Sequence, residues 1–313
     1  MYGQENYRKV KEIIEQRRAE AIATSEERNR EVALLSEDIR QIDAELRQTG
    51  LRLFKAACEG KDIAPIRERN LFLCGEREKA LVRIGKPADY TEIKYTCPDC
   101  SDSGYVGTRM CKCMRELLIT ENIKSSGMGR LIERQSFDNF DLDRYKVKPE
   151  NYERMKSNLE AAKSFVDSFG TGKTLLLIGS TGTGKTHLST SIAKAVIERG
   201  WNVIYDSAQN IVSTFEDDKF RSGYAPHEPE SNKYLECDLL ILDDLGTEFT
   251  SQFTVSCIYN LINTRQNKGL STVISTNLTA AELARKYEDR IYSRLVGSDS
   301  KILLFAGNDS RIG

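Results

Sequence analysis

The second half of the chain alternates short apolar runs with longer stretches that mix apolar and polar residues. The apolar runs predict buried strands at 174–178, 202–206, 238–242, 271–276 and 301–305, with helices between them. Strands that alternate with helices in this way form a parallel sheet covered by helices on both faces. We therefore expect residues 131–313 to form an α/β domain that binds its ligand at the carboxyl ends of the strands.

The first 90 residues have a helical pattern instead. Proline is absent between Glu5 and Glu59, and apolar residues there recur at spacings of three and four, at Val32, Leu35, Ile39, Ile42, Leu46 and, in the same register, Leu53. This seam predicts one long helix with coiled-coil character. A second helix is expected to reach about Ile84, and the residues expected to face back onto the first are Leu71, Cys74, Leu81 and Ile84. We predict an antiparallel hairpin over residues 1–90, because a helix without a partner would leave the seam in water.

A glycine-rich loop follows the first apolar run directly. Residues 179–186 read G-S-T-G-T-G-K-T, and a strand, this loop and a helix in that order are typical of a phosphate-binding loop rather than a chance match. Gly182 and Gly184 let backbone N–H groups surround a phosphate. Lys185 supplies a positive charge, and Thr186 supplies a hydroxyl ligand for Mg²⁺. The residues expected to bind a nucleoside triphosphate are Gly179, Ser180, Thr181, Gly182, Thr183, Gly184, Lys185, Thr186 and His187.

The apolar run at 238–242 ends in two acids, Asp243 and Asp244. At the tip of a buried strand, Asp243 is placed to bind Mg²⁺ opposite Thr186, and Asp244 is placed to polarise the attacking water. Two adjacent carboxylates after such a strand are less typical of a solvated turn. Asn277 ends another strand, where it either orients the water, senses the γ-phosphate or is only a turn residue.

Four cysteines lie at metal-ligand spacing, in the pairs Cys97/Cys100 and Cys111/Cys113. Four thiolates from two tight turns suit tetrahedral Zn²⁺ and leave no position open for catalysis. Free thiols or a redox-active C-x-x-C pair are the alternative. A segment this short has too little core to fold alone, so we expect a structural zinc-binding unit over 91–130. The remaining cysteines are expected to be small buried residues: Cys58, Cys74, Cys237 and Cys257.

Two further segments suggest contacts outside the nucleotide site. Arg290 and Arg294 lie four residues apart on one helical face, which fits either a solvated basic face or arginine fingers that reach the nucleotide of a neighbouring subunit. The stretch 215–233 interleaves cations with aromatic residues, which fits either single-stranded DNA binding or a flexible surface loop. Its candidate contacts are Lys219, Phe220, Arg221 and Tyr224.

Composition narrows the class of protein. Of the 313 residues 30% are charged, and the formal net charge is -1, so any contact with DNA has to come from a local patch. No apolar run approaches membrane-spanning length, and the first residues lack the apolar core of a signal peptide. We therefore expect a cytoplasmic protein with no membrane partner, in a compartment that keeps its cysteines reduced.

Taken together, these motifs resemble the AAA+ ATPases of the DnaC/DnaI and IstB group. The resemblance rests on the phosphate loop with G-K-T-H-L, the L-D-D-L-G-T-E strand, the S-T-N strand and the D-R-I-x-S-R-L box, and it covers roughly Cys97 to Arg311. The cysteine unit followed by F-D-N-F-D-L is similar to the replicative helicase loaders of Gram-positive bacteria and their phages. The resemblance implies ATP and Mg²⁺ as cofactors, Arg294 as an arginine finger supported by Arg290, and self-association of several subunits around DNA.

Two features depart from the pattern of the group. Asp244 stands where many AAA+ motors have glutamate, and its shorter reach implies slow hydrolysis that suits a switch. Few residues follow the arginine box, so a full helical lid with a second sensor arginine is not expected. Arg311 is a candidate substitute for that sensor.

The resemblance implies an ATP-dependent loader that grips a hexameric replicative helicase through residues 1–90 and the zinc unit, and delivers it to single-stranded DNA. An IstB-like transposition helper that acts on a transposase is the alternative. A metabolite kinase is disfavoured because nothing suggests an acceptor pocket, and a GTPase because no N-K-x-D motif is present. A passive scaffold is disfavoured because Lys185, Thr186 and Asp243 are all intact.

Overall fold

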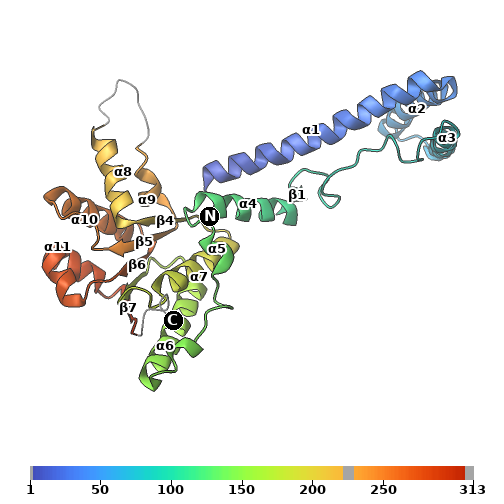
Figure 1. Ribbon diagram of the computed structural model, residues 1–313. Coiled ribbons are helices and arrows are strands. Elements are labelled where there is room, and N and C mark those ends of the chain that lie inside the picture. Colours follow the sequence, from blue (N-terminus) through green and yellow to red (C-terminus); the bar gives the residue numbers. More distant parts are fainter. Residues whose placement is uncertain (1–2, 221–228, 307–313) are drawn as a thin grey trace. The chain divides into compact units, whose positions relative to one another are not determined.

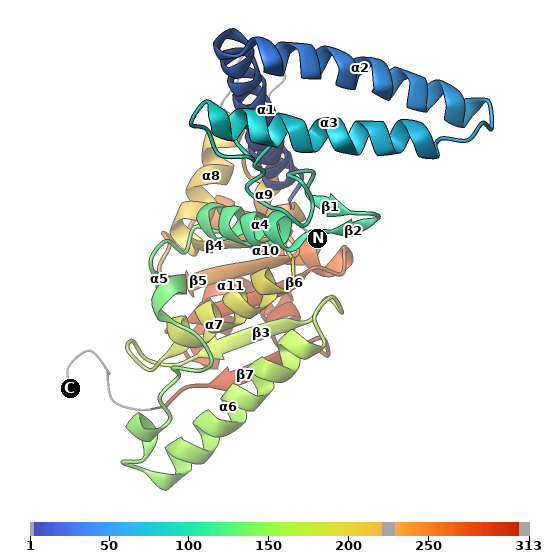
Figure 2. The same ribbon diagram turned by 90° about the vertical axis from the view of Figure 1, so that its right-hand side faces the viewer.

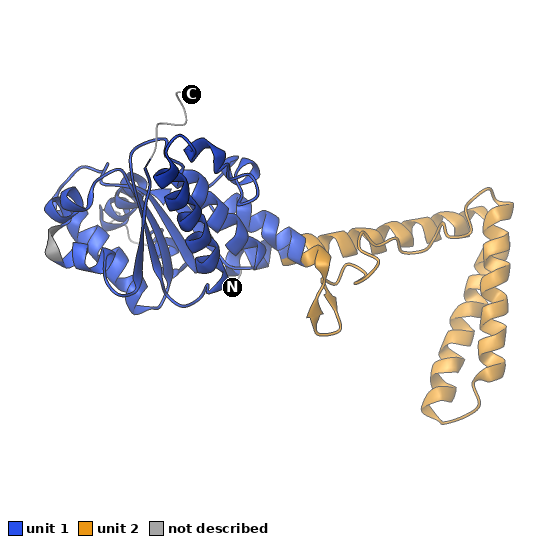
Figure 3. Ribbon diagram, turned by 90° about the horizontal axis from the view of Figure 1, so that it is seen from below, with its two compact units in different colours: residues 1–10, 115–313 blue, residues 11–114 orange. Residues whose placement is uncertain are grey.

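The computed structural model describes residues 3–220 and 229–306. The chain divides into two compact units, one formed by residues 1–10 and 115–313 and the other by residues 11–114 (Figure 3). The sequence-based division into 1–90, 91–130 and 131–313 stays a prediction.

The larger unit is built on one five-stranded sheet in which all strands run parallel (Figure 1). The strand order is β4-β5-β6-β3-β7, and the bounds are β3 Thr174–Ile178, β4 Val203–Ser207, β5 Leu239–Leu245, β6 Ser271–Thr276 and β7 Ser300–Leu304. Each strand lies close to its predicted position, so the predicted parallel α/β fold is confirmed. The order places β5 and β6 side by side, which brings their polar carboxyl ends to one edge of the sheet.

Helices cover both faces of this sheet (Figure 2). Their bounds are α4 Lys112–Ser125, α5 Leu131–Arg134, α6 Pro149–Asp167, α7 Lys185–Glu198, α8 Ala208–Phe220, α9 Asn232–Glu236, α10 Gln252–Asn267 and α11 Ala280–Leu295, with a short 3₁₀ turn η1 at Asp143–Tyr145. Alternate residues of β3 enter different cores. Leu175 and Leu177 pack with α6 and α7, while Leu176 and Ile178 pack with α8, α10 and α11.

The N-terminal helices correct the prediction of one long helix over 5–59. The chain forms α1 Gln4–Leu35 and α2 Glu37–Cys58, separated at Ser36. Ser36 has an extended backbone (φ -142°, ψ 121°), and its hydroxyl accepts the Ile39 N–H at 3.3 Å. An extended residue cannot continue the helix, so the serine begins a new one. The hairpin is formed by α2 and α3 (Ala64–Arg83).

The predicted apolar seam is only partly correct. Val32, Ile39 and Leu81 are buried together as expected, but Leu35, Leu71 and Cys74 are exposed, and Cys58 is exposed as well. The heptad register does not run through the break at Ser36, and α3 buries Leu73 and Ala80 together with the predicted Leu81. Cys237 and Cys257 are buried, as predicted.

The cysteine unit has little regular structure. A two-stranded antiparallel sheet, β1 Tyr105–Val106 and β2 Arg109–Met110, lies between the two cysteine pairs, and α4 begins within the second pair. Among the described residues, no helix is both long enough and apolar enough to span a bilayer.

Candidate nucleotide site and cysteine cluster

The phosphate loop joins β3 to α7 in a conformation that needs glycine. Gly182 and Gly184 have φ angles of 76° and 95°, in the left-handed region that residues with a Cβ rarely adopt. A Cβ on Gly184 would also collide with the Tyr145 hydroxyl, and a Cβ on Gly179 would collide with the Phe305 carbonyl. The glycines therefore allow the compact loop conformation that can surround a phosphate.

Lys185 begins α7 and is buried within the loop. Its ammonium group donates to the carbonyls of Gly179 and Ser180 at 2.6 and 2.8 Å, and to Oδ1 of Asn277 at 2.7 Å. The loop lysine is thus brought together with Asn277, the residue that directly follows β6. Thr183 is buried and donates to the Ser180 carbonyl at 2.8 Å, which braces the loop from inside.

Asp243 lies near the carboxyl end of β5, with only 8% of its surface exposed. One carboxylate oxygen accepts the Tyr205 hydroxyl from β4, and the other accepts the Ser275 hydroxyl from β6. Both bonds come from neighbouring strands, so the carboxylate has a fixed orientation. An oxygen donor held in this way suits a hard cation such as Mg²⁺.

Asp244 has a φ of 55°, which is unusual for a residue with a side chain. The register between β5 and β6 shifts between Leu242 and Leu245, so Asp244 forms an irregularity at the strand end. Its N–H donates to Ser275 Oγ at 3.0 Å, and the side-chain amide of Asn277 donates to its carboxylate at 3.4 Å. Lys185, Asn277 and Asp244 therefore form one connected polar group.

A cavity of about 420 Å³ opens beside this group. Its lining includes the predicted residues Thr181, Gly182, Gly184, Lys185, Thr186, His187, Asp244 and Asn277. The rest of its lining, here called the wall, comes from residues to which the sequence analysis gave no role in the site: Gln135, Asn139, Phe140, Asp141, Arg144 and Tyr145. The signal for most of this wall was the clustering of aromatic residues in F-D-N-F-D-L-D-R-Y, which is typical of a packed segment.

This wall is attached directly to the phosphate loop. The Tyr145 hydroxyl donates to the Thr183 carbonyl at 2.9 Å, and its ring stacks with Phe140 at a centroid distance of 6.3 Å. Phe140 in turn meets the His187 ring edge-on at 5.1 Å. His187 Nε2 lies 3.0 Å from Asn139 Oδ1 and 3.2 Å from the Ser136 carbonyl. Burial lowers the pKa of His187, so its imidazole is neutral at pH 7.

Arg290 and Arg294 do not line this cavity. Both guanidinium groups lie over the ring of Tyr259 on α10, at 4.6 and 5.5 Å from its centroid. Arg294 also lies 3.4 Å from Gln266 Oε1. The two arginines therefore share one helical face, as predicted.

The candidate DNA segment is only partly described. Lys219 lies in the last turn of α8, with its ammonium group over the rings of Phe253 and Phe220, at 4.8 and 5.7 Å from their centroids. Arg221, Tyr224 and the candidate sensor Arg311 lie outside the described residues.

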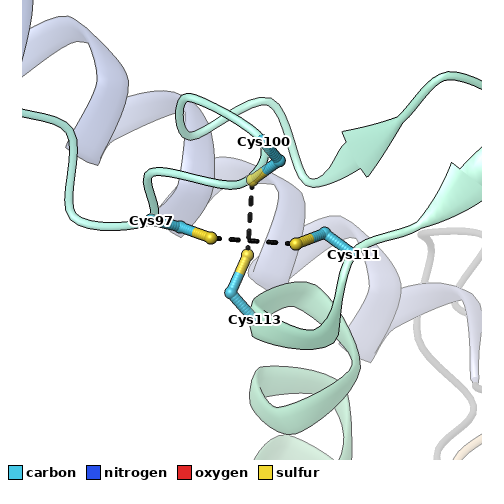
Figure 4. A group of neighbouring side chains, drawn as sticks. All are labelled: Cys97, Cys100, Cys111 and Cys113. Atoms are coloured by element: carbon cyan, nitrogen blue, oxygen red, sulfur yellow. Dashed lines mark hydrogen bonds between the residues drawn. The ribbon is translucent and has the colours of Figure 1, made fainter.

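Four cysteine sulfurs point toward one another (Figure 4). Their Sγ atoms all lie within 4.8 Å of one another, with 3.7 Å between Cys97 and Cys111 and 3.5 Å between Cys100 and Cys113. These separations are near the roughly 3.8 Å between sulfurs that Zn–S bonds of about 2.3 Å produce in a tetrahedron, and far above a disulfide length. The pKa of Cys100 is lowered to about 7: burial opposes the shift, but hydrogen bonds from the Gly104 N–H and the neighbouring thiols outweigh it.

A family model for the IstB-like ATP binding proteins matches residues 119–296, which is more than half of the chain. The chain belongs to this family. The predicted AAA+ ATP-binding domain is confirmed, and the match spans the phosphate loop, both acids, Asn277 and the two arginines. The match begins after the four cysteines, so the N-terminal helices and the cysteine cluster lie outside it.

Similar proteins include a replicative helicase loader and a protein of a phage-like element. The chain is 26% identical over 192 residues to the replicative helicase loader DnaC of Escherichia coli strain K12, which covers 61% of this chain and 75% of that protein. It is 27% identical over 229 residues to the phage-like element PBSX protein XkdC of Bacillus subtilis strain 168, which covers 66% and 82%. Among solved structures, the DnaC helicase loader aligns with a TM-score of 0.48 and 24% identity, over 56% of this chain and 98% of that one.

Proposed function

We propose that this protein is an ATP-dependent loader of a replicative DNA helicase, in which ATP binding and slow hydrolysis act as a switch. The observation that carries the proposal is the convergence of Lys185, Asn277 and Asp244 beside a glycine loop, in a chain whose relatives include helicase loaders. In the proposed site Lys185 binds the phosphates, Asp244 orients the attacking water, and Asn277 senses the γ-phosphate.

Mg²⁺ fits the donors of this site. Thr186 and Asp243 are the residues that would hold it, and their oxygens are the ligand type that the ion prefers. Bound Mg²⁺ would neutralise charge on the β- and γ-phosphates. The wall formed by Phe140 and Tyr145 is proposed to contact the nucleotide base, because aromatic faces stack well on bases.

The proposed active form contains several subunits. Arg290 and Arg294 lie over the ring of Tyr259 of their own chain, and neither lines the nucleotide cavity. A nucleotide held by a neighbouring subunit is the target we propose, with Arg294 as the finger and Arg290 in support.

The N-terminal unit is proposed to hold the helicase. Four thiolates binding one Zn²⁺ would fix the cysteine unit, while α2 and α3 expose large apolar side chains. These are Leu51, Phe54, Leu71 and Phe72, each more than half exposed. Exposed apolar residues on a helical hairpin are suited to binding another protein.

The experiment is a binding measurement with the full chain and the replicative helicase of the same genome. We expect a complex on size-exclusion chromatography that the double substitution Phe54→Ser, Leu71→Ser weakens at least tenfold. Val147→Ser, which changes an equally exposed apolar residue of the larger unit, is the matched control and should bind normally. A wild-type chain that does not bind the helicase would overturn the loader proposal.

A transposition helper is the second candidate, because the matching family model carries the IstB name. The same binding experiment with a transposase of the same genome distinguishes the two candidates. Binding to a transposase without binding to the helicase would favour the second one and leave the proposed ATP chemistry unchanged.

A further inference from the structure

The Asp243 carboxylate is held between two hydroxyl groups from its neighbouring strands. Along β4, β5 and β6, side chains alternate between the two faces of the sheet, and Ile241 and Val273 face the core that contains α7. Asp243 and Ser275 are two residues further along their strands, so they lie on the same face. Tyr205, on the edge strand β4, reaches across to the same carboxylate.

The Tyr205 hydroxyl remains a donor in this position. Its ring is half-buried against the core on the α7 side. The hydroxyl donates to Asp243 Oδ2, while the Ser275 hydroxyl donates to Oδ1.

The backbone of Tyr205 is fixed from outside the sheet. Because β4 is an edge strand, its outer N–H groups need partners elsewhere, and the Tyr205 N–H donates to the Ser126 carbonyl at 2.7 Å. Gly127 packs so closely there that a Cβ on it would lie 2.5 Å from the Tyr205 carbonyl oxygen. Asn122, near the end of α4, donates to the Trp201 carbonyl at 3.4 Å, just before β4.

We propose that Tyr205 is a positioning residue for the Mg²⁺-binding carboxylate of Asp243, and that the Ser126–Gly127 segment after α4 holds Tyr205 in place. This inference rests on the proposed ATPase site. It gives the segment after α4 a physical connection to the proposed metal site through Tyr205. Residues that orient metal ligands typically change metal affinity by about tenfold or more when they are removed.

The test compares nucleotide affinity with and without Mg²⁺ by calorimetry, using ADP and the full chain. Tyr205→Phe should weaken ADP binding about tenfold in Mg²⁺ but leave it unchanged in EDTA. Tyr234→Phe is the matched control, since it removes a buried tyrosine hydroxyl that donates to a different carboxylate, Asp206, at 2.7 Å. Tyr234→Phe should lower the stability of the fold, but its affinity for ADP in Mg²⁺ should equal that of the wild type.

Two further variants test whether the Ser126–Gly127 segment holds Tyr205 in place. Gly127→Ala should weaken ADP binding in Mg²⁺ but not in EDTA, as Tyr205→Phe does. The double variant should bind ADP little more weakly than either single variant, because both substitutions act through the same carboxylate. If Gly127→Ala does not fold, Asn122→Ala loosens the same segment and should show the same pattern. Normal Mg²⁺-dependent affinity in the folded variant would overturn this part.

The inference and the proposed function fail differently. A wild-type protein that binds no nucleotide would contradict the ATPase site itself. A wild-type protein with Mg²⁺-dependent binding that Tyr205→Phe leaves unaltered would contradict only the role of Tyr205.

Discussion

At the scale of single residues, some groups of the nucleotide site can be predicted from the sequence and others cannot. The loop glycines, Lys185 and Asp243 could be found because their chemistry requires a fixed order along the chain. Tyr145 and Tyr205 could not, since their roles depend on which strand or turn lies next to the loop. Tyr205 would become predictable only once β4 is known to neighbour β5.

His187 provides a residue-level prediction on pH. Burial lowers its pKa below 6.5, so at pH values beneath that the unfolded chain binds a proton that the folded chain resists. Stability should therefore fall as the pH drops through 6.5 and below. We expect urea unfolding between pH 7.5 and 5.5 to show a smaller loss in His187→Gln than in the wild type. An identical pH dependence in the two proteins would argue against a buried neutral imidazole.

At the scale of elements, the positions of the strands were predictable and the packing of the N-terminal helices was not. Buried parallel strands are uniformly apolar and short, so their positions can be read directly. The break at Ser36 depends on a single residue's backbone conformation, which the heptad pattern ignores. Once the helix restarts, the side chains beyond the break face other directions.

Glu248 anchors the turn after β5 to α11, the helix that carries the two arginines. It is buried, accepts the Gly246 N–H at 2.8 Å and the Tyr287 hydroxyl, and lies 3.2 Å from the Lys286 ammonium. Glu248→Ala leaves the Gly246 N–H and the Tyr287 hydroxyl without their acceptor and removes the carboxylate beside Lys286, so we expect a loss of about 3 kcal/mol in the free energy of unfolding, measured in urea.

The matched control for Glu248 is a solvent-exposed ion pair. Asp143 and Lys146 lie 2.8 Å apart with both side chains more than half exposed, so Asp143→Ala should cost less than about 1 kcal/mol. Equal losses of unfolding free energy in the two variants would show that the buried Glu248 contributes no more to stability than an exposed ion pair.

The cysteine unit should depend on a metal for its structure. Protein purified without chelators is expected to contain about one Zn²⁺ per chain by metal analysis. Cys97→Ser should lose the metal and raise hydrogen exchange over residues 95–114, because β1 and β2 alone are too short to be stable. Protein that carries no metal yet shows the same slow exchange would contradict the proposed zinc site.

At the scale of the whole molecule, the arginines of α11 were predictable as a pair, but their target was not. Their spacing indicates a shared face, whereas the proposed target, a nucleotide held by a second subunit, cannot be derived from the sequence of one chain. We expect Arg294→Ala to keep nucleotide affinity and lose ATP turnover, while Arg285→Ala on the same helix behaves as wild type.

Complementation tests whether the finger acts between subunits. Lys185→Ala lacks the loop lysine but keeps Arg294, and Arg294→Ala has the opposite defect. If the finger works in trans, a mixture of the two inactive proteins should recover part of the wild-type turnover. If the two variants still assemble but their mixture stays inactive, Arg294 does not act as a finger between subunits.

The proposed activity of this protein is the delivery of a replicative helicase to DNA. The most direct measurement is unwinding by the replicative helicase of the same genome, on single-stranded circular DNA coated with single-strand binding protein and annealed to a labelled strand. We predict that unwinding requires this chain and ATP, and that Lys185→Ala abolishes the stimulation. Unwinding that is equally fast with and without the wild-type chain would contradict the loader account.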